Sequence, residues 1–95
     1  MYNEEILKWL KETHGNISNI GFKYVVRVIE LTIDNPDLPL TDIYEMVSKE
    51  YGTKTNNAEK VIRTYRKKTI YADIKNKEFI SLLVYDYQES KSKEA

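Results

Sequence analysis

The placement of turn-forming residues constrains the fold of this chain more than any other feature. Its 95 residues include only three glycines and two prolines, and the turn signals at Gly15, residues 34–39 and Gly52 lie far apart. Glycine, proline and small polar residues mark most turns, so long uninterrupted segments separate these points. Such a chain favours a few long helices over many short strands joined by tight turns.

Apolar residues recur at helical spacing in the segments between these turns. They lie three and four positions apart, which gives each segment one apolar face. We expect helices over residues 3–13, 18–33, 41–51 and 56–70 and from residue 76 onward, with Gly15 placed to end the first. The predicted fold class is therefore all-α with about five helices. The polar tail, residues 89–95, is expected to fray.

The segment 18–33 also has features of a strand. Phe22, Tyr24, Val26 and Val28 alternate along the chain, and β-branched residues are dense there. The same run has about 14 residues without a turn signal, which is long for a strand and usual for a helix. We therefore predict a helix.

The ends of the third and fourth segments carry residues that cap helices. Thr41 is expected to cap the third segment, and Gly52 to follow it in the left-handed conformation that ends many helices. Asn56 and Glu59 have the spacing of a capping box at the start of the fourth segment. Because only about four residues, 52–55, connect the two segments, the sequence predicts a central helix-turn-helix.

Composition excludes several classes of site. The chain has no cysteine, which excludes a disulfide framework, a thiolate metal site and a cysteine nucleophile. A single histidine cannot form a multi-histidine metal site, and the sequence offers no set of acid, base and nucleophile. No apolar run approaches the roughly 20 residues that span a bilayer, and residues 1–5 do not begin a secretory signal. We expect one soluble cytoplasmic domain over residues 1–95 that is not an enzyme and needs no cofactor, metal or membrane.

The chain is neutral overall, but its charges are unevenly distributed. Fifteen lysines and arginines balance fifteen aspartates and glutamates. Residues 54–77 contain eight basic and two acidic residues, a difference of +6, so the remainder carries −6. A basic segment that includes the second helix of a helix-turn-helix is typical of a surface that binds nucleic acid.

The fourth segment has two opposite faces when its residues are placed about 100° apart around a helix axis. The apolar face consists of Ala58, Val61, Ile62, Tyr65 and Thr69. The opposite face consists of Asn57, Lys60, Arg63, Thr64 and Lys67, with Lys68 beside it. A face of this kind is often simply solvated. The short glycine turn before it and the acidity of the rest of the chain favour an interface here.

The polar face carries groups that can read base edges. Arg63 and Lys60 can donate hydrogen bonds to the O6 and N7 atoms of guanine. Asn57 can pair with an adenine edge. The sequence therefore predicts that specificity comes from the middle of the fourth segment, with Thr64 as a further neutral hydrogen-bonding group.

Phosphate contacts are expected on both sides of these residues. Lys67 and Lys68 lie a turn or more further along and can neutralise backbone phosphates. Thr55 and Asn56, at the start of the segment, can offer backbone N–H groups to a phosphate. Affinity is therefore expected from the whole basic surface between residues 54 and 68.

Four pieces of the sequence are similar to a known family. They are Ile20, Tyr24 and Arg27 after Gly15; residues 41–44 followed by 49–53; Asn56, Glu59, Ile62 and Arg63; and residues 76–80. From about residue 15 to residue 89, the chain resembles the C-terminal DNA-binding effector domain of the stage-zero sporulation protein A family of response regulators. The resemblance rests on all four pieces occurring in the family's order.

The resemblance implies a mode of binding. In this family the recognition helix enters the major groove, and molecules bind head-to-tail on neighbouring short boxes. The positions that correspond to base-facing residues are Glu59, Lys60, Arg63 and Thr64. The chain departs from the family at Lys60, where the family has arginine, at Thr64, where it has histidine, and at Asn57, where it has another arginine. Residues 71–75 also replace a longer connector that includes a helix, and we expect no receiver domain before the motif.

Taken together, the sequence predicts sequence-specific binding of double-stranded DNA by a transcription regulator whose recognition helix spans about residues 56–70. A homodimer is a further expectation, either head-to-tail on tandem sites or through the last helix. Leu82 and Tyr85 lie off the main apolar stripe of that helix, which fits either a dimer face or a helix packed between two others. The alternative function is a protein-interaction module that keeps the helix-turn-helix scaffold but binds another regulator or a polymerase subunit.

Overall fold

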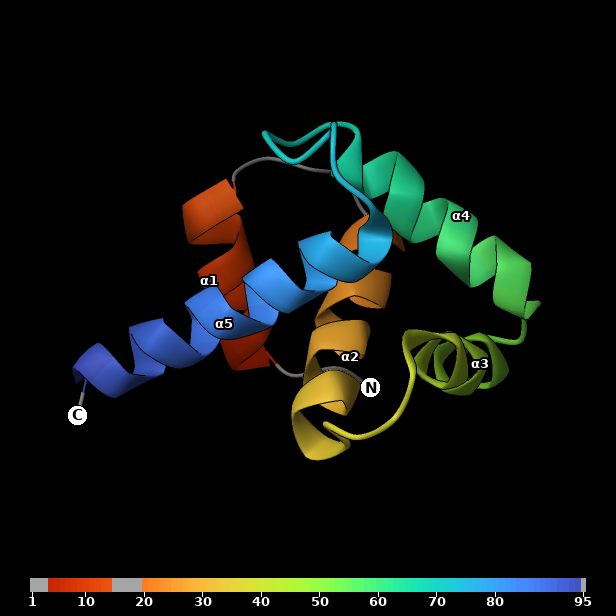
Figure 1. Cartoon of the computed structure of the whole chain (residues 1–95), viewed down its shortest axis with the longest axis horizontal. Helices are drawn as coiled ribbons and strands as arrows, with labels where there is room; N and C mark the ends of the chain where they lie inside the picture. Colours follow the sequence, from red (N-terminus) through yellow and green to blue (C-terminus); the bar gives the residue numbers. More distant parts are fainter. Residues whose placement is uncertain (1–3, 15–19, 95) are drawn as a thin grey trace.

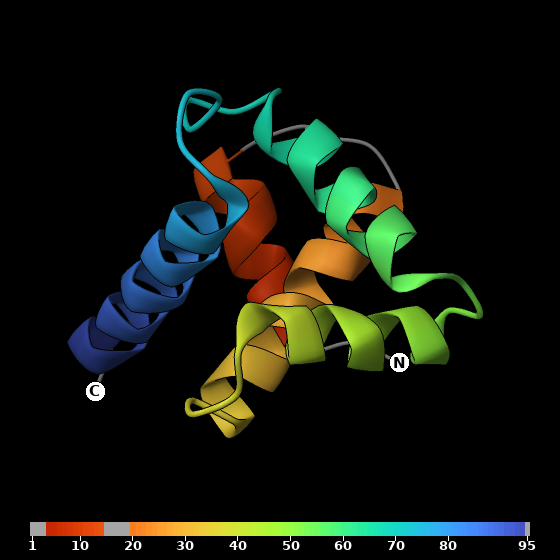
Figure 2. The same cartoon turned by 45° about the vertical axis from the view of Figure 1, so that its right-hand side comes forward.

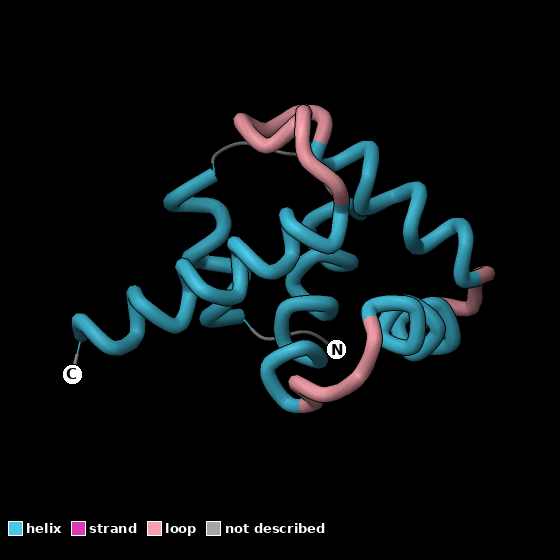
Figure 3. The backbone as a smooth tube through the Cα atoms, in the orientation of Figure 1, coloured by secondary structure: helices cyan, strands magenta, loops and turns pink. Residues whose placement is uncertain are grey.

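Five α-helices account for the regular structure in residues 4–14 and 20–94, the part of the chain that the computed structural model describes. They are α1 (Glu4–His14), α2 (Ile20–Asp34), α3 (Leu40–Glu50), α4 (Thr55–Arg66) and α5 (Asn76–Glu94) (Figure 1). Loops connect the helices from α2 to α5, and the described residues contain no strand (Figure 3). The predicted all-α class with five helices is confirmed. Gly15, expected to end the first helix, lies outside the described residues.

α2 is the central helix, and each of the other four packs against it (Figures 1 and 2). Its buried residues are Phe22, Tyr24, Val25, Val26, Val28, Ile29 and Leu31. Charged residues are confined to one narrow stripe of α2, Lys23, Arg27, Glu30 and Asp34, and neighbouring helices cover the wide apolar remainder. This explains why the segment also showed the alternation of a strand, and the predicted helix is confirmed.

α5 continues to Glu94, through the residues that the sequence predicts to fray. Two contacts with α1 hold this part of the helix. The ring of Tyr87 meets that of Trp9 edge-on, with centroids 5.4 Å apart. Further along, Lys91 forms an ion pair with Glu5. The tail therefore has partners that its own sequence does not reveal.

α3 and α4 form the predicted helix-turn-helix. Gly52 has a φ of 65°, as expected for the residue that follows a helix end. The N–H of Thr53 donates to the Ser48 carbonyl at 2.8 Å, and that of Gly52 donates to the Lys49 carbonyl at 3.4 Å. These two bonds satisfy carbonyl groups that the end of α3 would otherwise leave free.

The predicted side-chain caps at the starts of α3 and α4 are wrong. α3 starts one residue before Thr41, with Pro39 as its N-cap, and the Pro39 carbonyl accepts from the N–H of Asp42 at 3.0 Å. Proline is tolerated here because the N-cap residue is extended, with φ −61° and ψ 151°, and an N–H at this position is not needed for the hydrogen bonds of the helix. α4 starts at Thr55, with Lys54 as N-cap and no side-chain cap, so Asn56 lies inside its first turn.

α2 holds the end of α3 and thereby the turn into α4. The ring of Tyr51 stacks on that of Tyr24, with centroids 4.8 Å apart and planes 14° from parallel. Arg27 donates to both carboxylate oxygens of Glu50, at 2.7 and 2.6 Å, and also to Glu30 at 2.5 Å. The hydrogen bonds from Arg27 lower the pKa of Glu50, and those to Glu50 raise the pKa of Arg27. The turn therefore has a fixed position relative to the core.

Candidate nucleic-acid interface

The apolar side of α4 fixes how the helix is turned. Ala58, Ile62 and Tyr65 are buried, as the sequence predicts. The Tyr65 ring meets Phe22 of α2 edge-on at 5.5 Å. Gly21 allows this approach, because a Cβ atom at that position would lie 2.9 Å from Cδ2 of Tyr65. The opposite side of α4 must therefore face away from the core.

The residues on that opposite side are exposed. They are Asn57, Lys60, Thr64 and Lys67, which we name the open face of α4. The side chain of Asn57 donates to Oγ1 of Thr53 at 2.8 Å, which steadies it but leaves its amide oxygen for a ligand. The open face thus combines two cations with two neutral hydrogen-bonding groups.

α4 ends at Arg66, four residues earlier than predicted. Lys67 is its C-cap, and Lys68 lies in the turn that follows. The Thr69 hydroxyl donates to the Arg66 carbonyl at 2.7 Å, and the Thr69 N–H donates to the same carbonyl at 2.9 Å. These bonds turn the chain away from the helix axis. Lys67 and Lys68 therefore project from the end of α4 and not from a continuing helix.

Arg63 lies at the border of the open face and not within it. Its Nη1 donates to both oxygens of Glu59, at 2.8 and 3.1 Å, and its side chain is 43% exposed. The two residues line a groove on the neighbouring flank of α4. Arg63 must leave Glu59 before it can donate both of its terminal nitrogens to a guanine.

The start of α4 presents backbone donors. The N–H groups of Asn57 and Ala58 bond to the Lys54 carbonyl, at 3.0 and 3.1 Å. Those of Thr55 and Asn56 have no acceptor in the part of the chain that the structure describes. The Thr55 side chain is half-buried, with its hydroxyl 3.5 Å from that of Ser48, whereas Asn56 is exposed.

The structure separates the eight basic residues of segment 54–77 into two groups. Arg66 is buried and Arg63 is paired with Glu59, which leaves six of the eight. These six are Lys54, Lys60, Lys67, Lys68, Lys75 and Lys77. All six are exposed, and none forms an ion pair with a described residue. Lys60 lies on α4, Lys54, Lys67 and Lys68 lie at its two ends, and Lys75 and Lys77 lie at the start of α5.

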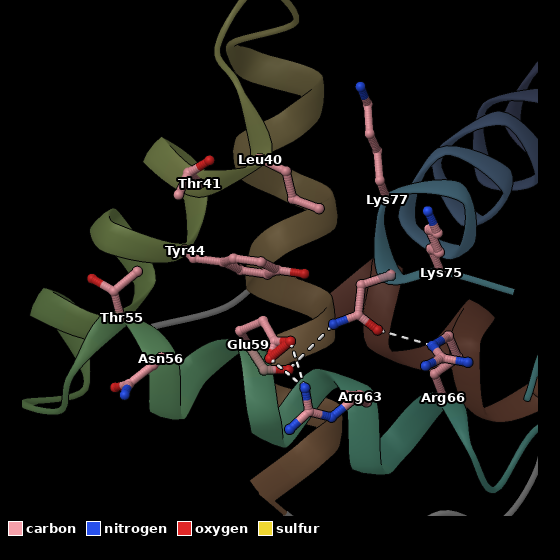
Figure 4. A pocket seen from close by; sticks show the side chains of 11 residues that line it. Leu40, Thr41, Tyr44, Thr55, Asn56, Glu59, Arg63, Arg66, Lys75 and Lys77 are labelled. Carbon is pink, nitrogen blue, oxygen red and sulfur yellow. Dashed lines mark hydrogen bonds and ion pairs between the residues drawn. The ribbon is translucent and has the colours of Figure 1, made fainter.

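A groove of about 960 Å³ lies between α3, α4 and the start of α5 (Figure 4). The residues of interest along it are Tyr44, Glu59, Arg63, Arg66, Lys75 and Lys77. The sequence does not predict this groove, because residues 75–77 reach α4 only through the folded connector. The one available signal is that Arg66 would lie next to the apolar stripe of α4.

Arg66 holds the connector between α4 and α5 in place. Its side chain donates to the amide oxygen of Asn76 at 2.9 Å and to the carbonyls of Tyr71 and Ala72, at 3.3 and 2.5 Å. Asn76 in turn donates to the Glu59 carbonyl at 3.2 Å. All of these acceptors are uncharged, so the buried guanidinium of Arg66 has no carboxylate partner among the described residues.

Tyr44 brings a hydroxyl group into the groove from α3. The side chain is 6% exposed, and its hydroxyl faces Asn76 without a hydrogen bond of normal geometry. Burial raises the pKa of Tyr44 to about 12. The hydroxyl therefore keeps its proton at neutral pH and remains a donor.

Comparisons with known proteins found no relative of this chain. The chain matches no protein-family model, no curated protein and no solved structure. Within the described ranges, no three histidine, cysteine or acidic side chains come together as metal ligands would. Nor is any helix there both long enough and apolar enough to cross a bilayer.

Proposed function

We propose that the chain binds double-stranded DNA in a sequence-specific way and acts as a transcription regulator. In this proposal α4 lies in the major groove, with Lys60, Asn57 and Thr64 of its open face toward the base edges. Arg63 joins them by leaving Glu59. Lys67, Lys68 and the N–H groups of Thr55 and Asn56 contact phosphates.

The observation that carries the proposal is the group of six exposed lysines without ion pairs, gathered on and around the second helix of a helix-turn-helix. Of the seven basic residues outside segment 54–77, three form ion pairs with described residues, namely Arg27, Lys49 and Lys91. Cations kept free around one exposed helix face suit a partner with regularly spaced negative charge. Duplex DNA is such a partner.

The resemblance to the sporulation effector domain supports the same function. It suggests that copies bind head-to-tail on neighbouring boxes and that the open face of α4 selects the sequence. Because Asn57, Lys60 and Thr64 differ from the family, the preferred boxes are expected to differ too. The proposal includes no reaction and no cofactor.

The test is a fluorescence-anisotropy titration of duplexes selected from a random pool by the wild-type protein. The double variant Lys60→Ala/Arg63→Ala should weaken binding to the selected duplex by about thirtyfold or more, since each base-reading side chain is worth about 1–3 kcal/mol. The loss on a scrambled duplex should be much smaller.

The matched control is Lys8→Ala/Lys23→Ala, which removes the same charge from exposed positions of α1 and α2. It should leave the preference for the selected duplex unchanged. Circular dichroism confirms that both variants fold. An equal loss for both variants, or no selected duplex at all, would contradict the proposed reading face.

A second candidate function is protein interaction through α5. Tyr85 and Leu82 are 61% and 40% exposed, and their spacing of three residues makes them neighbours on one side of this helix. This function predicts self-association or partner binding that Leu82→Ser/Tyr85→Ser removes and Lys60→Ala/Arg63→Ala does not. Sedimentation equilibrium of the two variants separates it from DNA binding.

A further inference from the structure

We infer that the groove between α3, α4 and the start of α5 is a binding site for a phosphate group. A phosphate group occurs in small phosphorylated ligands and in the backbone of DNA. The inference therefore stands whether or not the chain binds DNA, and the experiment below separates the two sources.

The charges that line the groove favour an anion. Arg63, Arg66, Lys75 and Lys77 contribute +4 and Glu59 contributes −1, a sum of +3 among the described residues that line it. Glu59 is already paired with Arg63. The remaining three cations, from the end of α4 and the start of α5, have no carboxylate partner in the described part of the chain.

Among these cations, Arg66 gives the strongest indication that the groove binds an anion. Its side chain is buried, and its hydrogen bonds go only to uncharged oxygens. A buried charge without a counter-ion is costly, and an anion in the groove would offset that cost. Nη2 of Arg66 donates to no described group, and guanidinium groups form strong, directional hydrogen bonds to phosphate oxygens.

Tyr44 provides a second and independent indication. Its buried hydroxyl lacks a hydrogen-bond partner, although most buried polar groups have one. Figure 4 shows this hydroxyl pointing from α3 across the groove, toward the side that carries Lys75. A phosphate oxygen between the two sides would accept its proton.

The N-terminal ends of two helices also favour an anion in the groove. α3 and α5 both begin at the rim, where Leu40 and Asn76 line the groove. The first N–H groups of a helix are free and its N-terminal end is partially positive, so both ends favour an anion. Donors from three helices thus surround one space, which suits the several acceptor oxygens of a phosphate group better than a single carboxylate.

The experiment is a titration of the full ¹⁵N-labelled chain with inorganic pyrophosphate, followed by NMR at constant ionic strength. We expect saturable shifts of the Tyr44 and Lys77 amides and of the Arg66 Nε–H. Lys75→Gln/Lys77→Gln should weaken pyrophosphate binding about tenfold, because it removes two charge-assisted contacts. Tyr44→Phe should weaken it several-fold.

Each variant has a matched control. Lys8→Gln/Lys23→Gln removes the same charge from exposed positions of α1 and α2, outside the groove. Tyr65→Phe removes another buried hydroxyl without a partner, from a residue that does not line the groove. Both controls should bind pyrophosphate as the wild type does. Shifts that rise linearly without saturation, or an equal loss in test and control variants, would overturn the inference.

Addition of a DNA duplex identifies the source of the phosphate. If the duplex displaces pyrophosphate from the groove, a backbone phosphate is the ligand, and if both bind together, it is a small phosphorylated molecule. Either result supports the site. A chain that binds no duplex but binds pyrophosphate in the groove would contradict the proposed function and leave this inference intact.

Discussion

At the residue scale, two glycines are needed for different physical reasons. Gly21 has no room for a side chain, because a Cβ atom would lie 2.9 Å from Cδ2 of Tyr65. Gly52 has ample room, since no atom lies within 4 Å of such a Cβ, but its φ of 65° disfavours other residues. One glycine sets how closely α2 approaches α4, and the other sets the turn before α4.

Substitution separates these two roles. Gly21→Ala should lower the free energy of unfolding by about 1–2 kcal/mol, because the cost of overpacking exceeds the gain in helix propensity. Gly52→Ala should cost about 1–2 kcal/mol through backbone strain alone. Urea denaturation measures both effects. Asparagine should recover part of the loss at position 52 but none at position 21, and a more stable Gly21→Ala protein would contradict the close packing of α2 on α4.

At the element scale, the position of the helix-turn-helix depends on contacts from α2. The stacking of Tyr24 on Tyr51 and the ion pair of Arg27 with Glu50 hold the end of α3. α4 follows the turn directly, so the contacts that hold the end of α3 also fix the position of the open face of α4. An ion pair in this place contributes to stability in a pH-dependent way.

The pKa of Glu50 is lowered in the folded chain, mainly by its hydrogen bonds from Arg27. A carboxylate with a lowered pKa stabilises the fold above its ordinary pKa and loses that contribution as the pH falls through the folded value. Glu50→Gln should therefore be less stable than the wild type near neutral pH, by about 0.5–1 kcal/mol for a partly exposed pair. The difference should shrink as the pH falls from about 4.5 downward. Urea denaturation as a function of pH tests this, and a constant difference would contradict it.

The sequence was informative about elements and less so about their ends and contacts. Helical spacing and Gly52 predicted α3, α4 and the turn between them, because these features are local. The starts of α3 and α4 were missed because Pro39 and Lys54 take the N-cap positions in an extended conformation without a side-chain cap, so no capping side chain marks them in the sequence.

Local sequence patterns also predicted only part of the candidate sites. The exposure of the open face followed from the position of the apolar stripe on α4. The burial of Arg66 did not, because its partners come from the connector and from Asn76. The groove beside Tyr44 likewise requires residues from three helices, which no local pattern brings together.

At the scale of the whole molecule, a neutral chain keeps a basic region separate from its other charges. Arg27 and Lys91 pair with carboxylates elsewhere in the described chain, whereas the six lysines around α4 do not. A neutral total charge removes long-range attraction to DNA, so binding should depend on contacts made by this region. Salt should then weaken binding in proportion to the phosphates that these lysines neutralise.

The most direct test of DNA binding through α4 is an anisotropy titration of a duplex at several salt concentrations, with the wild type and Lys67→Ala. The logarithm of the affinity should fall linearly with the logarithm of the salt concentration, and Lys67→Ala should make that slope shallower by about one. The loss should be the same for selected and scrambled duplexes, because a phosphate contact carries no sequence information. No binding at low salt, or a slope unchanged by Lys67→Ala, would contradict the proposed interface.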